Sequence, residues 1–257
     1  TEAFWMEQFQ DVPDPLQLPL DRPRPEIKTY NGHRQSVRFD PKLVEQLAAF
    51  CAQEQVTTFT TLYAAFSVLM AELSGQDDVV VGVPMAGQAV AGQPALVGHA
   101  VNFLPLRTRV EMDGSFEDIL SATRDYFLEL NDHQRYTYAS LLRKLPVKRT
   151  SEQLPLVSVT FNVDQGMESF DFDGVAARYV TGPRDYVKHD LFVNIVLESE
   201  GPIVEVDHNA DILDAATARG WMDRYLELLR AAMAEPGRPV ADLVAATEDL
   251  AVPGGKR

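Results

Sequence analysis

The sequence predicts an α/β protein in which a mixed β-sheet and a layer of helices form a two-layer sandwich. Apolar residues recur at helical spacing in four long segments, and short valine-rich or alternating segments between them are typical of strands. These elements do not follow the strict βαβ alternation of an all-parallel sheet. With 257 residues, 46% of them hydrophobic, the chain is long enough to bury a large core.

The first 34 residues are predicted to be a helix end followed by an extended connector. Phe4, Trp5 and Phe9 share one face of a helix, and the chain starts within this pattern without Met, so we expect a fragment of a longer protein. Residues 11–34 are rich in proline and charge, which excludes a regular helix or a central strand. A short strand is expected at residues 35–39.

Two helices are predicted next. Asp40 is placed as the cap of the first, with a proline in its first turn and apolar residues as far as Cys51. The second covers residues 58–73, has a broad apolar stripe and ends at Gly75. Such stripes are typical of core packing, so we interpret Cys51 as a buried thiol and not as a nucleophile.

A pair of apolar strands is predicted after these helices. Residues 78–83 form a continuous valine-rich run that suits a buried strand, and Pro84 is expected to end it. Residues 85–98 are rich in Gly and Ala and are predicted to be a loop. A second apolar strand follows at residues 101–110, interrupted at Pro105.

The remaining elements are predicted from caps and alternation. Ser115 caps a helix, and Asp118 stands where a capping box places an acidic residue. A short helix is expected at residues 138–145, and the alternation at residues 157–163 predicts a half-exposed strand. Two further strand pairs are predicted, namely 170–172 with 176–180 and 191–197 with 203–208.

The last long helix is predicted to be capped by Asp214 and to bury a stripe from Trp221 to Ala232. Everything after Pro236 is interpreted as a linker. The predicted organisation is therefore a helix end and connector at 1–34, one domain at 35–235 and a tail at 236–257.

Composition excludes several classes of partner. The net charge of −15 repels phosphate, so we expect neither nucleic acid nor an anionic membrane surface as a partner. No apolar run is long enough to span a bilayer, and no secretory signal opens the chain. A single cysteine cannot form an internal disulfide. We therefore expect a cytoplasmic location.

Common catalytic motifs are absent from the sequence. It contains no P-loop, GxGxxG, HExxH, CxxC or GxSxG pattern. The five histidines are scattered, and none has the spacing of a metal site. The HxxD spacing of His208 and Asp211 carries little information by itself. We therefore predict no metal site in this chain.

An ordered series of short segments, over roughly residues 4–235, resembles the condensation-domain family of nonribosomal peptide synthetases. The segment LVGHAVNFLPLR at 96–107 is similar to the family's VGxFVNxxxxR, with Ala100 where Phe is usual. The segment RTSEQLPL at 149–156 is a partial match to RDxSRNPL, with Gln153 in place of the second Arg. Weaker matches are FW at 4–5, LPLDRPRP at 18–25, DVVVGVP at 78–84, NDHQRYTY at 131–138, KHDL at 188–191 and HNAD at 208–211.

The resemblance implies a chloramphenicol-acetyltransferase-like fold of two α/β lobes, of which this chain is the C-terminal lobe. It also implies a tunnel between the lobes that admits the phosphopantetheine arm of a carrier protein from each side. In the tunnel an acceptor amine attacks a donor thioester. The family's HHxxxDG motif belongs to the N-terminal lobe, and this chain contains no His-His pair. We therefore expect no catalytic residue and no directly bound cofactor here.

The resemblance places four residues of this chain at the tunnel or lobe interface. Gly98 would permit close backbone approach. Asn102 would form a hydrogen bond across the interface or to a substrate amide, or else satisfy only local backbone. His99 is interpreted as structural, and Arg149 as part of an inter-lobe or surface ion pair. The implied partners are the N-terminal lobe, carrier proteins and, through the C-terminal linker, an adenylation domain.

Two other functions remain open at this point. One is a carrier-protein docking module without chemistry, and the other is a small acyltransferase that uses His99 or His133 as its base. The interpretation as one lobe makes a further prediction about the surface. A lobe without its mate should expose an apolar patch along residues 84–106 and 164–186.

Overall fold

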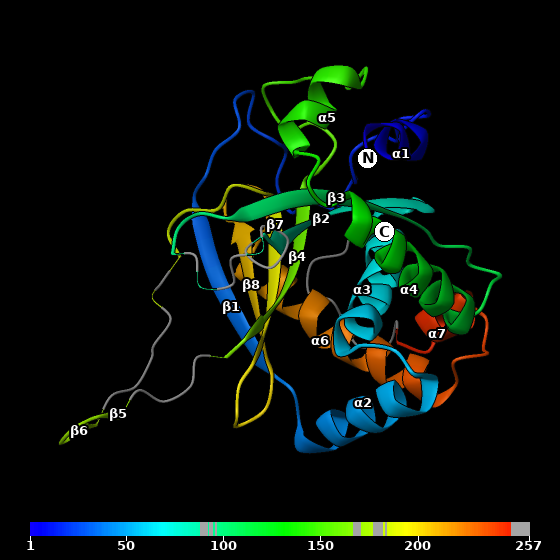
Figure 1. Ribbon diagram of the computed structural model, residues 1–257, viewed down its shortest axis with the longest axis vertical. Helices are drawn as coiled ribbons and strands as arrows, with labels where there is room; N and C mark the ends of the chain where they lie inside the picture. Colours follow the sequence, from blue (N-terminus) through cyan, green and yellow to red (C-terminus); the bar gives the residue numbers. More distant parts are fainter. Residues whose placement is uncertain are drawn as a thin grey trace.

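A six-stranded mixed sheet covered by helices on one face forms the body of the protein (Figure 1). The computed structural model describes residues 1–87, 92, 95, 97–166, 171–176, 182 and 184–247. The strand order is β1-β8-β7-β4-β2-β3. The strands are β1 Gly32–Arg38, β2 Asp78–Ala86, β3 Val101–Arg109, β4 Val159–Gln165, β7 Leu191–Leu197 and β8 Ile203–Asn209. The predicted α/β class with a mixed sheet is confirmed.

The strand pairing explains why the sheet is mixed. β1 pairs with β8, β8 with β7, and β2 with β3, each antiparallel. β4 is parallel to both of its neighbours, β7 and β2. The predicted pairing of 191–197 with 203–208 is therefore confirmed. β1 and β3 are the two edges of the sheet.

The helical layer is built around α3, which packs against α2, α4, α6 and α7. The helices are α1 Glu2–Gln8, α2 Pro41–Glu54, α3 Thr58–Ser74, α4 Phe116–His133, α5 Tyr138–Lys144, α6 Ala215–Ala234 and α7 Val240–Ala245. An unbroken run of α3 residues, 60–71, is buried, as expected for a helix at the centre of a core. α5 stands apart from this layer, at the sheet edge formed by β3 (Figure 1).

The predicted caps form as the residue types require. The Asp40 carboxylate accepts a hydrogen bond from the Leu43 N–H, and Ser115 and Asp118 form a reciprocal capping box. Gly75 ends α3 in the left-handed conformation, with φ +66°.

Asp214 does not cap α6 as predicted. It occupies the N-cap position, but its side chain forms an ion pair with Arg22 and makes no capping hydrogen bond. The carboxylate of Asp21 accepts from the Asp214 N–H and the Thr217 hydroxyl instead. The connector thus supplies the cap for a helix almost 200 residues away in the sequence.

The prediction that Pro84 ends its strand is wrong. β2 continues to Ala86, with Pro84 opposite Phe103 in the register with β3. The described pairing between β2 and β4 is at Gly82, so beyond Gly82 the strand needs hydrogen bonds on one side only. Pro105 also stays in register, because β3 is an edge strand.

The half-exposed strand predicted at 157–163 is more buried than expected. Val159, Thr160 and Phe161 are all buried, although they alternate in polarity. The polar side chains Ser158 and Thr160 are only 2% and 3% exposed, so the polar side is covered here as well as the apolar side. The alternation in polarity therefore reflects two buried faces of the strand, one polar and one apolar.

Residues 11–30 form neither a helix nor a strand, and a buried carboxylate holds this connector down. Asp190, 1% exposed, lies 2.7 Å from Arg24 and 2.9 Å from Lys28 in two ion pairs. Leu16 and Leu18, which belong to the same segment, are buried. β1 begins at Gly32, three residues before the predicted start, because its pairing with β8 extends to Asn209.

The tail predicted from residue 236 onward is in part a structural element. α7 buries Val240, Leu243 and Val244 against the core. The Val240 and Ala241 N–H groups donate to the carbonyls of residues 114 and 112, just before α4. The interpretation of 236–247 as linker is therefore wrong, and residues 248–257 lie outside the described residues.

A small hairpin projects from the body of the protein (Figure 1). It consists of β5 Asp171–Phe172 and β6 Val175–Ala176, paired antiparallel. Of the predicted pair 170–172 with 176–180, residues 170 and 177–180 lie outside the described residues. The observed turn is tighter than predicted and has Gly174 at φ +77°.

In the described part of the chain, no single helix is long and apolar enough to span a membrane. α2 and α3 together meet a length and composition criterion, but they are bent by 105° and α3 lies in the core.

Candidate functional site

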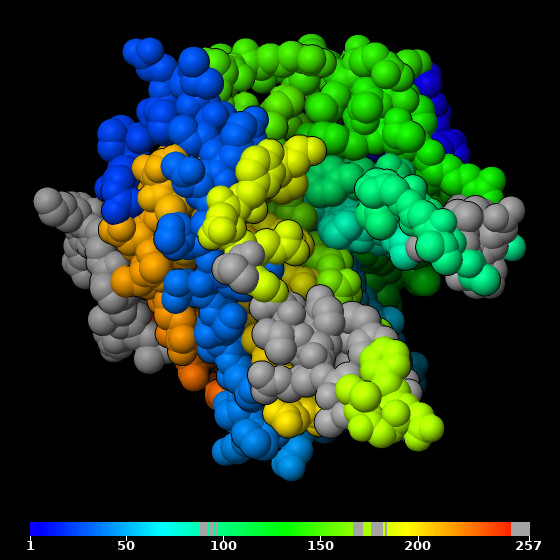
Figure 2. All heavy atoms as spheres, turned by 90° about the vertical axis from the view of Figure 1, so that its left-hand side faces the viewer, coloured from blue at the N-terminus to red at the C-terminus, as the bar shows by residue number. Residues whose placement is uncertain are grey.

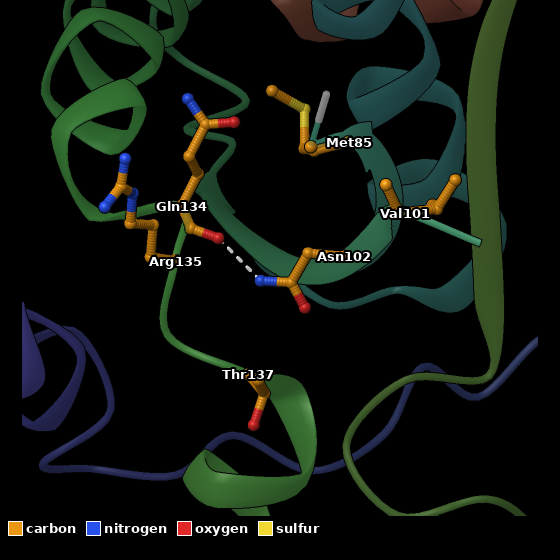
Figure 3. Close-up of a pocket in the computed structure, with 8 residues that line it drawn as sticks. Met85, Val101, Asn102, Gln134, Arg135 and Thr137 are labelled. Carbon is orange, nitrogen blue, oxygen red and sulfur yellow. Dashed lines mark hydrogen bonds between the residues drawn. The ribbon is translucent and has the colours of Figure 1, made fainter. Parts of the chain in front are cut away.

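A hollow lies at the N-terminal end of β3, beside the connection between α4 and α5 (Figure 3). Its volume is about 480 Å³, and it opens to the surface. Its lining combines a partly apolar strip from β2 and β3 with polar residues from the helix connection. The lining residues are Met85, Gly87, Ala100, Val101, Asn102, Gln134, Arg135 and Thr137.

Asn102 is the predicted site residue that the structure places in this pocket. Its side-chain Nδ2 donates to the carbonyl oxygen of Gln134 at 2.6 Å and to that of Tyr136 at 3.1 Å. Its Oδ1 accepts from the Phe103 N–H at 2.9 Å. The amide therefore joins β3 to the α4–α5 connection (Figure 3). These bonds use both Nδ2 hydrogens on carbonyls more than 30 residues away, so Asn102 does not satisfy local backbone alone.

The pocket's lining limits its chemistry. Among its described lining residues the one charged side chain is that of Arg135, and a guanidinium is not a general base. Carbonyls, amides and a guanidinium beside Met85, Ala100 and Val101 suit an extended ligand that alternates apolar and amide groups. The pocket can bind and orient such a ligand, but its lining residues cannot remove a proton.

Gly98 and His99 are exposed and do not line the pocket. A Cβ added at Gly98 would meet no atom within 4 Å, so this chain makes no close approach there. The close approach is at Gly87, where a Cβ would lie 2.4 Å from the Ala100 carbonyl oxygen. The sequence pattern did not single out Gly87, because it lies in a stretch rich in Gly and Ala.

Arg149 is exposed and also lies outside the pocket lining. Its guanidinium donates to the Leu142 carbonyl oxygen at 3.3 Å. No ion pair of Arg149 occurs among the described residues. The predicted surface or inter-lobe ion pair therefore has no partner within the part of the chain that the structure describes.

Three of the histidines, His133, His189 and His208, are packed within the fold. The His133 ring stacks on Phe4 at 4.3 Å, with its Nδ1 buried and without a hydrogen-bond partner. His189 stacks on Phe103 at 5.4 Å, and burial lowers the pKa of its imidazole to about 4. Burial also lowers the pKa of His208. Over the described ranges no histidine forms an ion pair with a carboxylate, the arrangement that orients a catalytic imidazole.

Arg107 is an organising residue that matches the final Arg of VGxFVNxxxxR but was not among the predicted site residues. Its guanidinium donates to both Asp78 and Asp11 and to the Gln8 carbonyl oxygen. The neighbouring Asp78 carboxylate is the largest cause that raises its pKa. These bonds join β3, β2 and the end of α1. The available signals were its match to the last residue of that motif and its charge within the apolar segment NFLPLR.

Large apolar side chains are exposed in both segments where a patch was predicted. Val97 and Val101 are exposed in the first, and Phe172, Val175 and Tyr186 in the second. Figure 2 faces this side of the molecule, with the hairpin in yellow-green at the lower right. The predicted exposure is thus seen at these five side chains, whereas Leu104 and Leu106 of the first segment are buried.

The described residues contain no group of three or more His, Cys, Asp or Glu side chains that could hold a metal ion. The acidic side chains that approach one another are instead paired with cations. Arg34, for example, bridges Glu205 at 2.8 Å and Asp207 at 2.6 Å across β1 and β8.

Curated relatives of this chain are very large synthetases. The chain is 32% identical over 249 residues to a linear gramicidin synthase of Brevibacillus parabrevis, covering 93% of the chain and 5% of the relative. It is 28% identical over 251 residues to surfactin synthase subunit 1 of Bacillus subtilis (strain 168), covering 97% of the chain and 7% of the relative. The chain therefore spans a small fraction of these relatives.

Solved structures with the same fold include a holo four-domain nonribosomal peptide synthetase bound to AMP and glycine. Its TM-score is 0.81 at 18% sequence identity, and the match covers 93% of this chain and 20% of that one. The condensation domain of the monacolin K polyketide synthase MokA has a TM-score of 0.76 and 22% identity, covering 93% of this chain and 58% of that one.

The family described as Condensation domain matches residues 1–250, almost the whole length of the sequence. This match agrees with the fold and with the ordered motifs around the pocket. The chain therefore belongs to the condensation-domain family.

Proposed function

We propose that this chain is the C-terminal lobe of a peptide-synthetase condensation domain with a chloramphenicol-acetyltransferase-like fold. In the assembled domain, an acceptor amine attacks the thioester of a carrier-bound acyl or peptidyl donor. The new C–N bond forms, the C–S bond breaks, and the donor carrier's thiol leaves with a proton. The substrates are held on the phosphopantetheine arms of two carrier proteins.

The observation that carries this proposal is the extent of the structural match. About 93% of this chain superposes on condensation-domain structures, but it covers only 58% of the MokA domain and 51% of the first condensation domain of the calcium-dependent antibiotic synthetase. The remaining half of those domains has no counterpart in the 257 residues. The family's HHxxxDG motif also has none, which supports its assignment to a partner lobe.

The pocket supports a binding role for this lobe. Aminolysis needs a group that takes the amine proton and walls that keep water from the thioester. The pocket has no base, but it offers carbonyl and amide groups beside an apolar strip, which suit a phosphopantetheine arm. Asn102 holds the α4–α5 connection, which carries the lining residues Gln134, Arg135 and Thr137, against β3.

The proposed partners are the N-terminal lobe, the two carrier proteins and a following adenylation domain. Two observations support them. The curated relatives are synthetases of which this chain spans 3 to 10%. The exposed apolar side chains at 97–101 and 172–186 suit a surface that a second lobe covers.

An assay of amide formation tests the proposal. This chain, incubated with an acyl-loaded donor carrier and an aminoacyl-loaded acceptor carrier, should give no amide above the uncatalysed rate. Adding an N-terminal lobe that contains HHxxxDG should produce amide, and replacing the second His of that motif should abolish it. Turnover by this chain alone would refute the proposal.

The same assay distinguishes the proposed function from the alternative of a docking module without chemistry. That alternative predicts carrier binding but no amide, even when the N-terminal lobe is present. The acyltransferase alternative predicts turnover by this chain alone that is lost in His99→Ala or His133→Ala. The packing of His133 under Phe4 counts against the second of these bases.

A further inference from the structure

A strongly basic segment interrupts the acidic sequence at residues 133–151. It contains five basic residues, and none of the chain's 38 Asp and Glu residues lies within it. The five are Arg135, Arg143, Lys144, Lys148 and Arg149. The whole chain has a net charge of −15, so the sign of the local charge is reversed here. We call these five side chains the basic surface.

All five side chains of the basic surface are exposed. They belong to α5 and its two flanks, which stand at the β3 edge of the sheet and form the green upper part of Figure 2. Lys144 forms an ion pair with Glu2. Arg143 and Arg149 donate to a hydroxyl and a carbonyl of their own segment, so those bonds leave their charge unbalanced.

The basic surface continues into the candidate pocket. Arg135 lines the pocket, and so does Thr137, which caps α5. The pocket and the basic surface therefore share the α4–α5 connection, which Asn102 fixes against β3. A partner bound on α5 would thus sit at the mouth of the pocket.

We infer that the basic surface is a docking surface for an acidic carrier-protein domain whose arm enters the adjoining pocket. This inference rests on the proposed function. Charge complementarity supports both the choice of surface and the choice of partner, because a basic surface attracts an acidic domain. An acidic domain is repelled by the rest of this acidic chain and attracted within about 8–10 Å of the basic surface. The charges therefore both accelerate the encounter and orient it.

A binding experiment without chemistry tests the inference. The probe is an excised peptide-synthetase carrier protein of net negative charge, in the unmodified form that lacks its arm. Its affinity for the 257-residue chain is measured by calorimetry at low and at moderate ionic strength. The triple variant Arg143→Glu, Lys148→Glu, Arg149→Glu should bind at least about tenfold more weakly, since three exposed ion pairs together exceed the roughly 1.4 kcal/mol of a tenfold change.

The matched control makes the same change in net charge elsewhere. Arg219 is exposed, Arg124 and Arg238 are partly exposed, and each pairs with an acidic residue within four positions in the sequence. Replacing these three by Glu should weaken binding by less than about threefold. A carrier variant with Asp and Glu of its docking face changed to Lys should restore binding to the first triple variant.

The outcomes also distinguish this inference from the proposed function. Wild-type affinity in the first triple variant, or equal losses in both triple variants, overturns the inference whatever the amide assay shows. Loss confined to the first triple variant supports it. If the carrier docks as inferred but the two lobes together form no amide, the proposed function fails while the docking surface stands.

Discussion

At the scale of single residues, the pocket depends on side chains that hold backbone in place. Asn102 has the clearest role, since its Nδ2 serves two carbonyls of the α4–α5 connection and its Oδ1 serves its own strand. No apolar residue could replace these bonds without leaving carbonyl groups unpaired.

Asn102→Asp should destabilise the protein by about 2 kcal/mol, because a carboxylate cannot donate and would face two carbonyl oxygens. Urea unfolding measures this free energy. Asn131→Asp is the matched control, since Asn131 Oδ1 accepts from Gln134 and a carboxylate keeps that role. Equal losses in the two variants would contradict the assigned role of Asn102.

His189 gives the protein a pH-dependent stability. Burial, followed by the positive charges of Lys188 and Lys28, lowers the pKa of its imidazole from 6.5 to about 4. Above pH 6.5 the imidazole is neutral in both the folded and the unfolded chain. Between pH 6.5 and about 4 the unfolded chain binds the proton first, so the free energy of unfolding falls as the pH falls.

From about pH 7.5 to about pH 5.0, His189 should account for a loss of about 2 kcal/mol in the free energy of unfolding. In His189→Gln the loss in free energy of unfolding over the same pH range should be smaller by about 2 kcal/mol. Denaturant unfolding at both pH values checks this. His99→Gln removes an exposed imidazole and should keep the wild-type pH dependence. An unchanged pH dependence in His189→Gln would exclude His189 as the cause.

At the scale of elements, α7 shows that the folded unit extends past the last long helix. Its six residues supply three buried side chains, and its backbone is tied to the turn before α4. A helix this short has little stability by itself, so packing holds it in place.

Leu243→Ala should therefore destabilise the protein by about 2–5 kcal/mol, because Leu243 is fully buried and its removal leaves a cavity. Leu128→Ala is the control, since Leu128 is 70% exposed on α4 and should change stability by no more than about 0.5 kcal/mol. Thermal and urea unfolding measure both. A negligible effect at Leu243 would mean that residues 236–247 are a linker after all.

At the scale of the whole molecule, the exposed apolar side chains gather in a few segments. Seven of the eight large ones lie in residues 27–30, 97–101 and 172–186, on the side of the protein shown in Figure 2. Apolar surface of this kind marks an interaction site or promotes self-association.

The isolated chain should therefore self-associate at high concentration. The triple variant Val97→Ser, Phe172→Ser, Val175→Ser should shift it towards monomer with little change in unfolding free energy, because these side chains are already in water. Sedimentation equilibrium measures the association. Leu128→Ser, on the helical layer, should leave the association unchanged. A wild-type chain that is monomeric at every concentration would argue against an uncovered interface.

The sequence by itself determined the fold class, most of the elements and the family resemblance. Helix stripes, the Asp40 and Ser115 caps and the Gly75 stop are local signals, since each depends on residues within a turn or two of the helix. The ordered motifs suggested the family for a similar reason, because a short motif is recognised from its residues alone, without knowledge of their contacts.

Only the tertiary structure decided where the strands end, what caps α6 and which residues form the pocket. Pro84 is tolerated because of the strands beside it, Asp21 caps α6 from the connector, and Asn102 meets Gln134 32 residues away in the sequence. These contacts join segments far apart in the chain. Their partners are chosen by packing and sheet order, which no local pattern encodes.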